Sequence, residues 1–283
     1  MTKCLSLLLL VLLVGTAQAA AGQSPESDRP RPKSVRVAGI VLKWIRTDKE
    51  ANFRRAEPMI RQAAAGGAQI VCTTECFLDG YAIEDKSIPL DVYRRLGEPI
   101  PDGPYYKRLA ALAQELRILL VAGMLEADGE ARYNTAVLIS PAGRLLGKYR
   151  KQYLEHELVR NRPGNSSPVF ETPFGRVGIL ICADRRLRSI ARQLKQGGAD
   201  FLLCLSGGMF GPKSNDRILQ ARSRDTGLPI VFVHPAEFLV TGPGGAILRQ
   251  TVLGDVLLVP PAEAGTGKDS KGVFYFDLPA GTS

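Results

Sequence analysis

The sequence of 283 residues predicts an α/β protein in which strands and helices alternate along the chain. Short apolar runs of strand length are followed by segments whose apolar residues recur at helical spacing. The stretches 35–72 and 177–205 each have the order strand, helix, strand, which places their strands parallel in a sheet. With 45% hydrophobic and 23% charged residues, the chain can bury the core of one large domain. These observations together predict a layered α/β sandwich.

The first 19 residues have the features of a secretory signal peptide. Lys3 gives a basic start, residues 5–14 are almost wholly apolar, and the A-Q-A of residues 17–19 matches a cleavage site. The apolar run is too short for a typical membrane span, and an uncleaved N-terminal anchor is the alternative. Residues 20–33 are polar and proline-rich, which predicts a flexible linker before a domain at 34–279. The expected location is secreted or periplasmic, with no stable membrane insertion after processing.

The first half of the domain is predicted to begin with a βαβ unit. Its strands are residues 35–41 and 68–72, and the helix between them is residues 52–65, where Pro58 predicts an early turn or kink. The same periodicities predict the following elements: a helix at 105–117 and strands at 118–124, 133–139 and 144–149.

The second half repeats the alternation of strands and helices. Its predicted elements are strands at 177–181, 201–205 and 228–233, helices at about 187–194 and 215–226, β structure at 246–258 and a last strand at 273–278. Gly207 and Gly208 follow the strand at 201–205. They either let a ligand approach the backbone closely or form only a turn.

Cys182 directly follows the predicted strand at 177–181 and precedes a helical face of Leu187, Ile190 and Leu194. The unpaired N–H groups and the dipole of a helix N-terminus favour a thiolate, which is the nucleophilic form of cysteine. A small buried hydrophobe is the alternative for a single cysteine. The strand-to-helix position therefore makes Cys182 the leading candidate for a catalytic residue.

Glu75 and Lys151 are the other candidates. Glu75 follows the strand at 68–72, so it lies beyond the carboxyl end of a strand, where α/β sheets gather ligand sites. Its apolar neighbours at 76–78 favour burial over the alternative of a surface loop. Lys151 follows the strand at 144–149, and a lysine among basic neighbours is usually solvated.

Four cysteines follow the predicted cleavage site: Cys72, Cys76, Cys182 and Cys204. An even number in an exported protein invites disulfides. We expect no essential one, because two of these cysteines fall in predicted core strands and a nucleophile has to be free. No metal-ligand cluster and no Ser/His/Asp arrangement stands out, which predicts no metal site. The net charge of +9 comes from basic residues scattered among acids, so we expect no nucleic-acid partner.

In chain order, Glu75, Lys151 and Cys182 with their flanks resemble the Glu-Lys-Cys triad of the nitrilase superfamily, the carbon–nitrogen hydrolases. The resemblance covers roughly residues 34–278 and implies an α-β-β-α sandwich. It also implies a homodimer or higher homo-oligomer, a reaction without a cofactor, and a small amide-type substrate. The function it implies is hydrolysis of a small linear amide or an N-carbamoyl compound.

The resemblance further implies a role for each residue. The Glu75 carboxylate takes the thiol proton of Cys182, the thiolate forms a thioester with the substrate, and Glu75 then activates water. The Lys151 ammonium and the Ala183 backbone N–H hold the oxyanion. Many members of the family have a second glutamate after the lysine. Glu157 is the best match and Glu155 is the rival.

The chain departs from the family pattern at Ala183, Thr74 and Gln152, where many relatives have an aromatic residue, proline and a nearby histidine, respectively. These positions lie in or beside the expected pocket, so they bear on the substrate more than on the chemistry. Two alternatives within enzymes are a nitrilase and an amide-forming acyltransferase. A catalytically silent secreted binding protein of the same fold is the alternative outside enzymes, and the presence of all three triad residues argues against it.

Overall fold

The structure, a computed structural model, describes residues 33–208, 211–253 and 271–279. The expected signal peptide, the expected linker up to residue 32 and the last part of the β structure predicted at 246–258 lie outside these residues. Within the described ranges, no helix is long and apolar enough to cross a membrane.

The first sheet carries the N-terminal βαβ unit. Its strand order is β13-β1-β2-β4-β5-β6, and β3 pairs with β4 beside this path. Strands β1, β2 and β4 are parallel, whereas β13, β5 and β6 pair antiparallel to their neighbours. The bounds of these strands are Ser34–Leu42 (β1), Ile70–Cys72 (β2), Glu98–Pro99 (β3), Leu119–Asp128 (β4), Ala131–Ile139 (β5), Leu145–Arg150 (β6) and Lys271–Pro279 (β13).

The second sheet has the order β12-β11-β10-β9-β8-β7, with β8, β9 and β10 parallel. Its strands are Val169–Thr172 (β7), Gly175–Ile181 (β8), Phe201–Leu205 (β9), Ile230–His234 (β10), Glu237–Thr241 (β11) and Ile247–Val252 (β12). The sequence did not predict β11 as a strand. Only Pro235 and Ala236 separate it from β10, so the two strands follow one another without a recognisable break in the apolar pattern.

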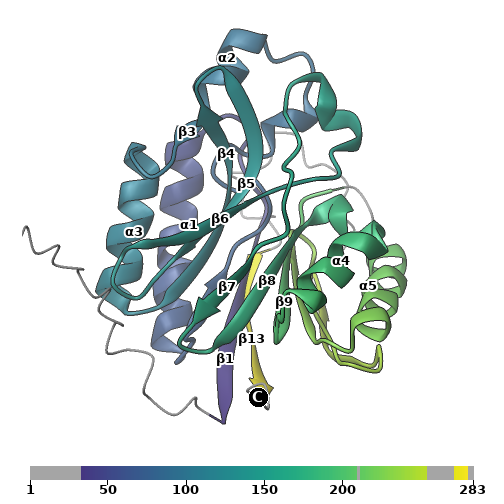
Figure 1. Cartoon of the computed structure of the whole chain (residues 1–283). Coiled ribbons are helices and arrows are strands. Elements are labelled where there is room, and N and C mark those ends of the chain that lie inside the picture. The colour runs from purple at the N-terminus through teal and green to yellow at the C-terminus, as the bar shows by residue number, and fades with distance from the viewer. Residues whose placement is uncertain (1–32, 209–210, 254–270, 280–283) are drawn as a thin grey trace, which may run out of the picture. The chain divides into compact units, whose positions relative to one another are not determined.

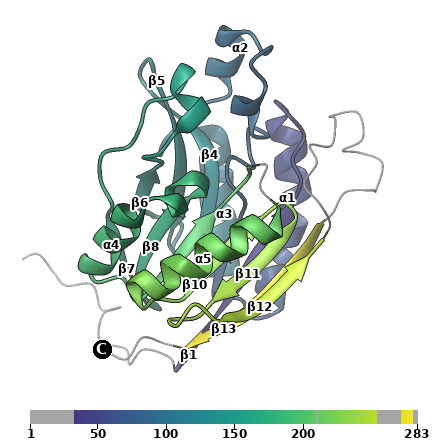
Figure 2. The same cartoon turned by 90° about the vertical axis from the view of Figure 1, so that its right-hand side faces the viewer.

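Two pairs of helices cover the outer faces of the two sheets (Figures 1 and 2). Helices α1 (Lys49–Ala65) and α3 (Pro104–Leu116) pack on the first sheet, and α4 (Arg188–Gln196) and α5 (Pro212–Thr226) pack on the second. A short helix, α2 (Leu90–Arg95), lies between β2 and β4 in the sequence. The predicted α-β-β-α sandwich is thereby confirmed.

The prediction of an early turn at Pro58 is wrong, because α1 runs unbroken through it. Pro58 and Arg54, the residue whose carbonyl group loses its helical partner, are both exposed, so the loss does not fall in the core. The helix starts earlier than predicted, at Lys49, because the Asp48 side chain accepts a hydrogen bond from the Ala51 N–H at 2.9 Å and caps the first turn.

The two sheets face one another across an apolar layer, in which Val37 of β1 and Val233 of β10 are fully buried. The sheets approach closely at Gly39, where an added Cβ would lie 2.4 Å from the ring of Phe238. A side chain at this position would overlap an aromatic ring that is itself completely buried. The packing of the sheets therefore depends on the absence of a side chain at residue 39.

Gly39→Ala is expected to lower the free energy of unfolding by about 1–3 kcal/mol, the usual cost of overpacking a core. Chemical denaturation monitored by circular dichroism measures this loss. Gly244→Ala is the matched control, because an added Cβ there meets nothing within 4 Å. Equal stability of the two variants would show that the sheets can move apart at Gly39 without a cost.

Candidate active site

Glu75 lies in the loop that follows β2, at the carboxyl end of a parallel strand as predicted. A backbone hydrogen bond and a close approach to β4 hold this loop in place. The Glu75 N–H donates to the Ser206 carbonyl at 3.3 Å, which connects the loop to the segment after β9 in the other sheet. At Gly123 of β4, an added Cβ would lie 2.6 Å from the Thr74 carbonyl oxygen, so a larger residue would push the loop away. Glu75 itself is completely buried.

Lys151 follows β6 and is buried, with 2% of its side chain exposed. Its backbone N–H donates to the Asn134 carbonyl at 2.8 Å, which ties the residue to β5 of the first sheet. The Nζ atom donates to Glu75 Oε1 at 2.8 Å and also to Glu157 Oε1. The general expectation that such a lysine is solvated does not hold here, because two carboxylates compensate its burial.

The electrostatics of this cluster keep Lys151 charged. Burial alone would lower its pKa, but the carboxylates of Glu157 and Glu75 outweigh that effect and raise the pKa of Lys151 well above its ordinary value. Glu75 uses one oxygen for this ion pair. Its other oxygen, Oε2, is buried and has no hydrogen-bond partner among the described residues. That oxygen is available to accept a proton from a group brought beside it.

The structure places Glu157, and not Glu155, beside the lysine. Both belong to a short 3-10 helix, Glu155–Val159, in which Glu157 is completely buried. Glu155 instead forms an ion pair with Arg186 near the surface. The two glutamates differ because residues two apart on such a turn point to different sides.

Two asparagines complete the cluster, and the sequence did not single them out. Asn134 Nδ2 donates to Glu75 Oε1 at 2.7 Å and to both carboxylate oxygens of Glu157 at 3.2 Å. Asn161 Nδ2 donates to Glu157 Oε2 at 3.1 Å, and Asn161 Oδ1 accepts from the Tyr93 hydroxyl at 2.6 Å. The signal available in the sequence was an asparagine in the strand predicted at 133–139, directly before its apolar part, since a buried amide there needs partners.

Cys182 follows β8 directly and is 5% exposed. The prediction that it begins the next long helix is wrong. Cys182 starts a five-residue 3-10 helix, Cys182–Arg186, and α4 begins only at Arg188. The separation has a backbone cause, because Leu187 between the two helices is extended (φ −91°, ψ 108°). A full helix dipole therefore does not act on the thiol, and Cys182 has a left-handed φ of 46°, a conformation unusual for a residue with a side chain.

Asp184 joins the cysteine turn to the lysine loop. Its Oδ2 accepts from the Ile181 N–H at 3.1 Å and from the Tyr149 hydroxyl at 2.7 Å, while Oδ1 accepts from the Tyr153 N–H at 2.8 Å. Burial raises the pKa of Asp184 to about 6, although these hydrogen bonds oppose the shift. The two segments that carry Lys151 and Cys182 are thus held together by one buried carboxyl group.

The side chains of Glu75 and Cys182 both lie beside the short backbone segment formed by Gly207 and Gly208. A Cβ at Gly207 would lie 3.1 Å from Glu75 Oε2, and a Cβ at Gly208 would lie 3.2 Å from Cys182 Sγ. The unpartnered carboxylate oxygen and the thiol therefore border adjacent glycines. The His234 ring contacts the Gly208 carbonyl at 2.7 Å and steadies this segment from β10.

The three predicted triad residues and Glu157 therefore lie in one buried cluster between the ends of the two sheets. Ala183 is adjacent to it and 4% exposed. The four described cysteines, Cys72, Cys76, Cys182 and Cys204, are free and buried. Among the described residues, no three His, Cys, Asp or Glu side chains gather where they could hold a metal ion.

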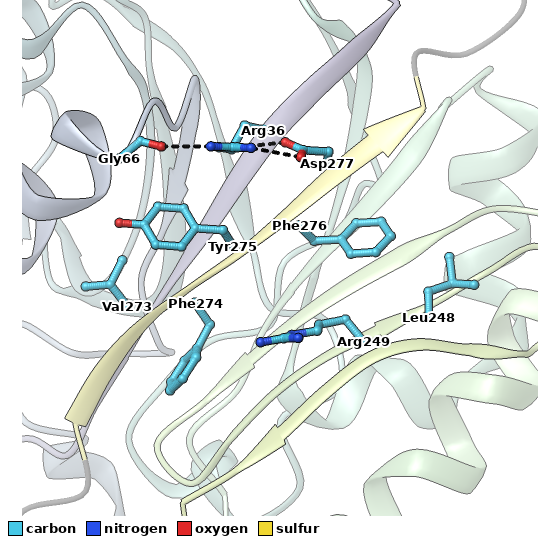
Figure 3. A pocket seen from close by; sticks show the side chains of 9 residues that line it. All are labelled: Arg36, Gly66, Leu248, Arg249, Val273, Phe274, Tyr275, Phe276 and Asp277. Carbon is cyan, nitrogen blue, oxygen red and sulfur yellow. Dashed lines mark hydrogen bonds and ion pairs between the residues drawn. The ribbon is translucent and has the colours of Figure 1, made fainter.

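A separate groove of about 660 Å³ lies at the edges of the two sheets, away from the cluster (Figure 3). It is lined by residues of β1, β12 and β13, among them Phe274, Tyr275 and Arg249. Arg36 at its border pairs with Asp277 at 2.8 Å. None of the triad residues lines this groove.

The sequence of the chain matches that of known hydrolases. The family described as carbon-nitrogen hydrolase matches residues 35–256. The chain is 33% identical to the human omega-amidase NIT2 over 219 residues, which cover 72% of this chain and 75% of that protein. It is 34% identical to a nitrilase of Pyrococcus abyssi over 170 residues, which cover 59% of this chain and 63% of that protein.

Solved structures share the fold at lower identity. The chain aligns with Nit3 of Saccharomyces cerevisiae, a member of branch 10 of the nitrilase superfamily, with a TM-score of 0.72, 23% identity and coverage of 87% of this chain and 90% of that one. An amidase from Nesterenkonia sp. aligns with a TM-score of 0.69 and 22% identity over 88% of this chain and 92% of that one.

Proposed function

Because the chain belongs to the carbon–nitrogen hydrolase family and is thus a hydrolase of carbon–nitrogen bonds, we propose that it cleaves a small linear amide or an N-carbamoyl compound. The observation that carries this proposal is the buried cluster in which Lys151 binds Glu75 while the second oxygen of Glu75 borders the same glycines as Cys182 Sγ. The relative named omega-amidase supports an amide substrate, whereas the relatives named nitrilase support the nitrilase alternative.

In the proposed first half-reaction, Glu75 Oε2 accepts the thiol proton of Cys182, and the sulfur attacks the carbonyl carbon of the amide. The carbonyl oxygen becomes an oxyanion, which the Lys151 ammonium and the Ala183 N–H stabilise. Collapse of this intermediate breaks the carbon–nitrogen bond. The proton held by Glu75 passes to the departing nitrogen, so ammonia or an amine leaves and a thioester remains.

In the second half-reaction, Glu75 removes a proton from water, and the resulting hydroxide attacks the thioester carbon. The carbon–sulfur bond then breaks, the sulfur regains its electron pair, and the acid leaves. The proton held by Glu75 returns to the sulfur and restores the starting thiol and carboxylate. Lys151 has the same electrostatic role in both halves. Glu157 acts on the reaction only through Lys151 and Asn134, both of which it contacts, so it is a positioning residue.

A screen for ammonia release across small amides, N-carbamoyl compounds, ureas and nitriles tests this proposal. Turnover of an amide or an N-carbamoyl compound is the expected result. Turnover confined to nitriles would instead support the nitrilase alternative, which the nitrilase relatives favour. Including hydroxylamine as an acceptor distinguishes an acyltransferase, because acyl transfer yields a hydroxamate. Absence of turnover together with tight binding of an amide would favour the silent binding protein.

Lys151→Met is expected to lower kcat by about 10²–10³-fold, because it removes the charge that meets the oxyanion. It also leaves two buried carboxylates beside one another without their cation, so the free energy of unfolding should fall by about 3–5 kcal/mol. Steady-state kinetics and urea denaturation measure the two effects. The destabilisation should shrink as the pH is lowered, since protonation of one carboxyl group removes the repulsion.

The control for this change is Lys195→Met, an exposed position in the last turn of α4. It should leave both activity and stability near those of the unaltered protein. If Lys151→Met remained as active as this control, Lys151 would have no part in stabilising the oxyanion.

We also propose that the protein is exported, on the strength of Lys3, the apolar run at 5–14 and the A-Q-A of residues 17–19. N-terminal sequencing of the protein from its native host should find a mature terminus near Ala20. A full-length chain that starts at Met1 in the cytoplasm would contradict export.

A homodimer or higher homo-oligomer remains the proposed assembly, and it rests on the family resemblance. Light scattering of the purified mature chain is the measurement that tests it. A mass of one chain at micromolar concentration would contradict it.

A further inference from the structure

We propose that Arg185 is a further catalytic residue, whose guanidinium group stabilises the Cys182 thiolate. The Arg185 Nη1 atom donates to Cys182 Sγ at 3.4 Å. This inference rests on the proposed function, because it takes Cys182 as the nucleophile. It adds a group that sequence reasoning missed and that has no place in the Glu-Lys-Cys scheme.

The burial of Arg185 requires an explanation. It is 1% exposed, and it is the largest of the fully buried side chains in the described residues. A charge so deep in the protein is costly unless an opposite charge compensates it. Its guanidinium group donates to two uncharged groups, the thiol of Cys182 and Asn215 Oδ1 at 2.7 Å, and its Nε atom has no hydrogen-bond partner among the described residues. A thiolate at Cys182 would supply the missing negative charge.

The neighbours of Arg185 hold the guanidinium in position rather than neutralise it. Asn215, in the first turn of α5, accepts from Nη2 and sets the direction in which Nη1 points. The Phe232 ring of β10 lies 5.7 Å from the guanidinium carbon and favours a cation over its face. A group fixed from two elements can stay beside the sulfur while the sulfur alternates between charged and neutral forms.

The short helix that begins at Cys182 does not itself provide the positive charge that would stabilise a thiolate. The 3-10 helix of Cys182–Arg186 is too short to provide the dipole of a full helix. Arg185 is the fourth residue of this helix, and its guanidinium group lies against the side chain of Cys182, the first residue. The turn therefore supplies through a side chain the positive charge that a longer helix would supply through its backbone.

The guanidinium would act twice in each turnover without gaining or losing a proton. When the thiol proton moves to Glu75, the electron pair left on sulfur faces Nη1. The charge then passes to the substrate oxygen as the carbon–sulfur bond forms, and Lys151 meets it there. When that bond breaks during hydrolysis, the electron pair returns to the sulfur beside Arg185. Arg185 thus stabilises negative charge on the sulfur, and Lys151 stabilises negative charge on the substrate oxygen.

Alkylation of Cys182 by iodoacetamide tests this pairing without any substrate. The rate is followed from pH 5 to 10 by mass spectrometry of the peptide that carries Cys182. In Arg185→Gln, the pH of half-maximal rate should move upward by about one to two units, the size expected for losing a hydrogen bond to a charged group. Arg185→Lys, which keeps the charge without the fork, should restore part of the shift. Arg188→Gln, an exposed arginine three residues along, is the matched control and should match the unaltered protein.

Other ionisable groups face Cys182 and Arg185 and also affect the pH dependence of the alkylation rate. None of them is changed in these variants. They are Glu75, Tyr81, Lys151, Asp184, Cys204 and His234. An unshifted profile in a folded Arg185→Gln would overturn the proposal. If that variant does not fold, an unshifted profile in Arg185→Lys would overturn it, since a lysine cannot reach both Cys182 and Asn215. A shifted profile in a protein that hydrolyses no amide would support the pair and reject the proposed function.

Discussion

Replacing Cys182 with alanine is expected to abolish turnover of whichever amide the ammonia screen identifies. The substitution removes the thiol that borders the same pair of glycines as Glu75 Oε2, so no thioester can form at residue 182. The Tyr81 hydroxyl borders the same glycine as Cys182 Sγ, since it would lie 3.9 Å from a Cβ at Gly208. Burial raises the pKa of Tyr81 well above its ordinary value, so it is not a substitute nucleophile. Rates are to be measured at enzyme concentrations high enough to detect a loss of 10⁵-fold or more, a range consistent with loss of a covalent nucleophile.

The matched control is Cys72→Ala, a buried cysteine at the end of β2 whose thiol is in a dry environment that raises its pKa. This variant should lose stability by an amount typical of a small cavity but keep its activity per folded molecule. Intact-mass spectrometry after rapid quenching should show an acyl adduct on the control and none on Cys182→Ala. Near-normal turnover by a correctly folded Cys182→Ala would refute the hydrolase mechanism built on this cysteine.

Glu75→Gln is expected to reduce kcat by about 10²–10⁴-fold, because it preserves size but removes the general base. Both half-reactions use this carboxylate, so a burst of ammonia in single turnover should slow together with steady-state hydrolysis. The amide also replaces a charged partner of Lys151, so thermal melts are needed to separate lost chemistry from lost stability. Glu155→Gln is the control, since Glu155 pairs with Arg186 near the surface and should tolerate the change.

Combining Glu75→Gln with Lys151→Met should be far less harmful than the product of the two single effects. The two side chains form one buried ion pair, and the loss of either already prevents the concerted use of the cluster. A fully multiplicative loss would instead indicate that the two residues act independently.

The sequence singled out Glu75 and Cys182 and the alternation of strands and helices because these signals are local, whereas Lys151 and the α-β-β-α arrangement came from the family resemblance. Glu75 and Cys182 each follow an apolar run that ends a parallel strand, and the carboxyl ends of such strands are where α/β sheets gather ligand sites. The periodicity of α1 and α4 placed their buried faces for the same reason. Each of these inferences needs only a few consecutive residues.

The remainder of the site depends on contacts between residues far apart in the sequence. Asn134 lies 59 residues from Glu75, and its importance comes only from the carboxylates that converge on its amide. In the sequence, Arg185 is one basic residue among many, and only the structure shows that its side chain is buried. The sequence also predicted that the next long helix begins at Cys182. The extended backbone of Leu187 instead separates a short 3-10 helix from α4, although the spacing of the apolar side chains gives no sign of this break.

The division of the triad between the sheets has a consequence for how the activity can be lost. Glu75 and Lys151 leave strands of the first sheet, whereas Cys182 leaves the second, and the apolar layer between the sheets sets their separation. Neither sheet alone carries all three of these side chains. On the proposed mechanism, a displacement of one sheet against the other would lower turnover while the strands and helices of each sheet stayed intact. Activity would then report the relative position of the two sheets, which far-UV circular dichroism does not.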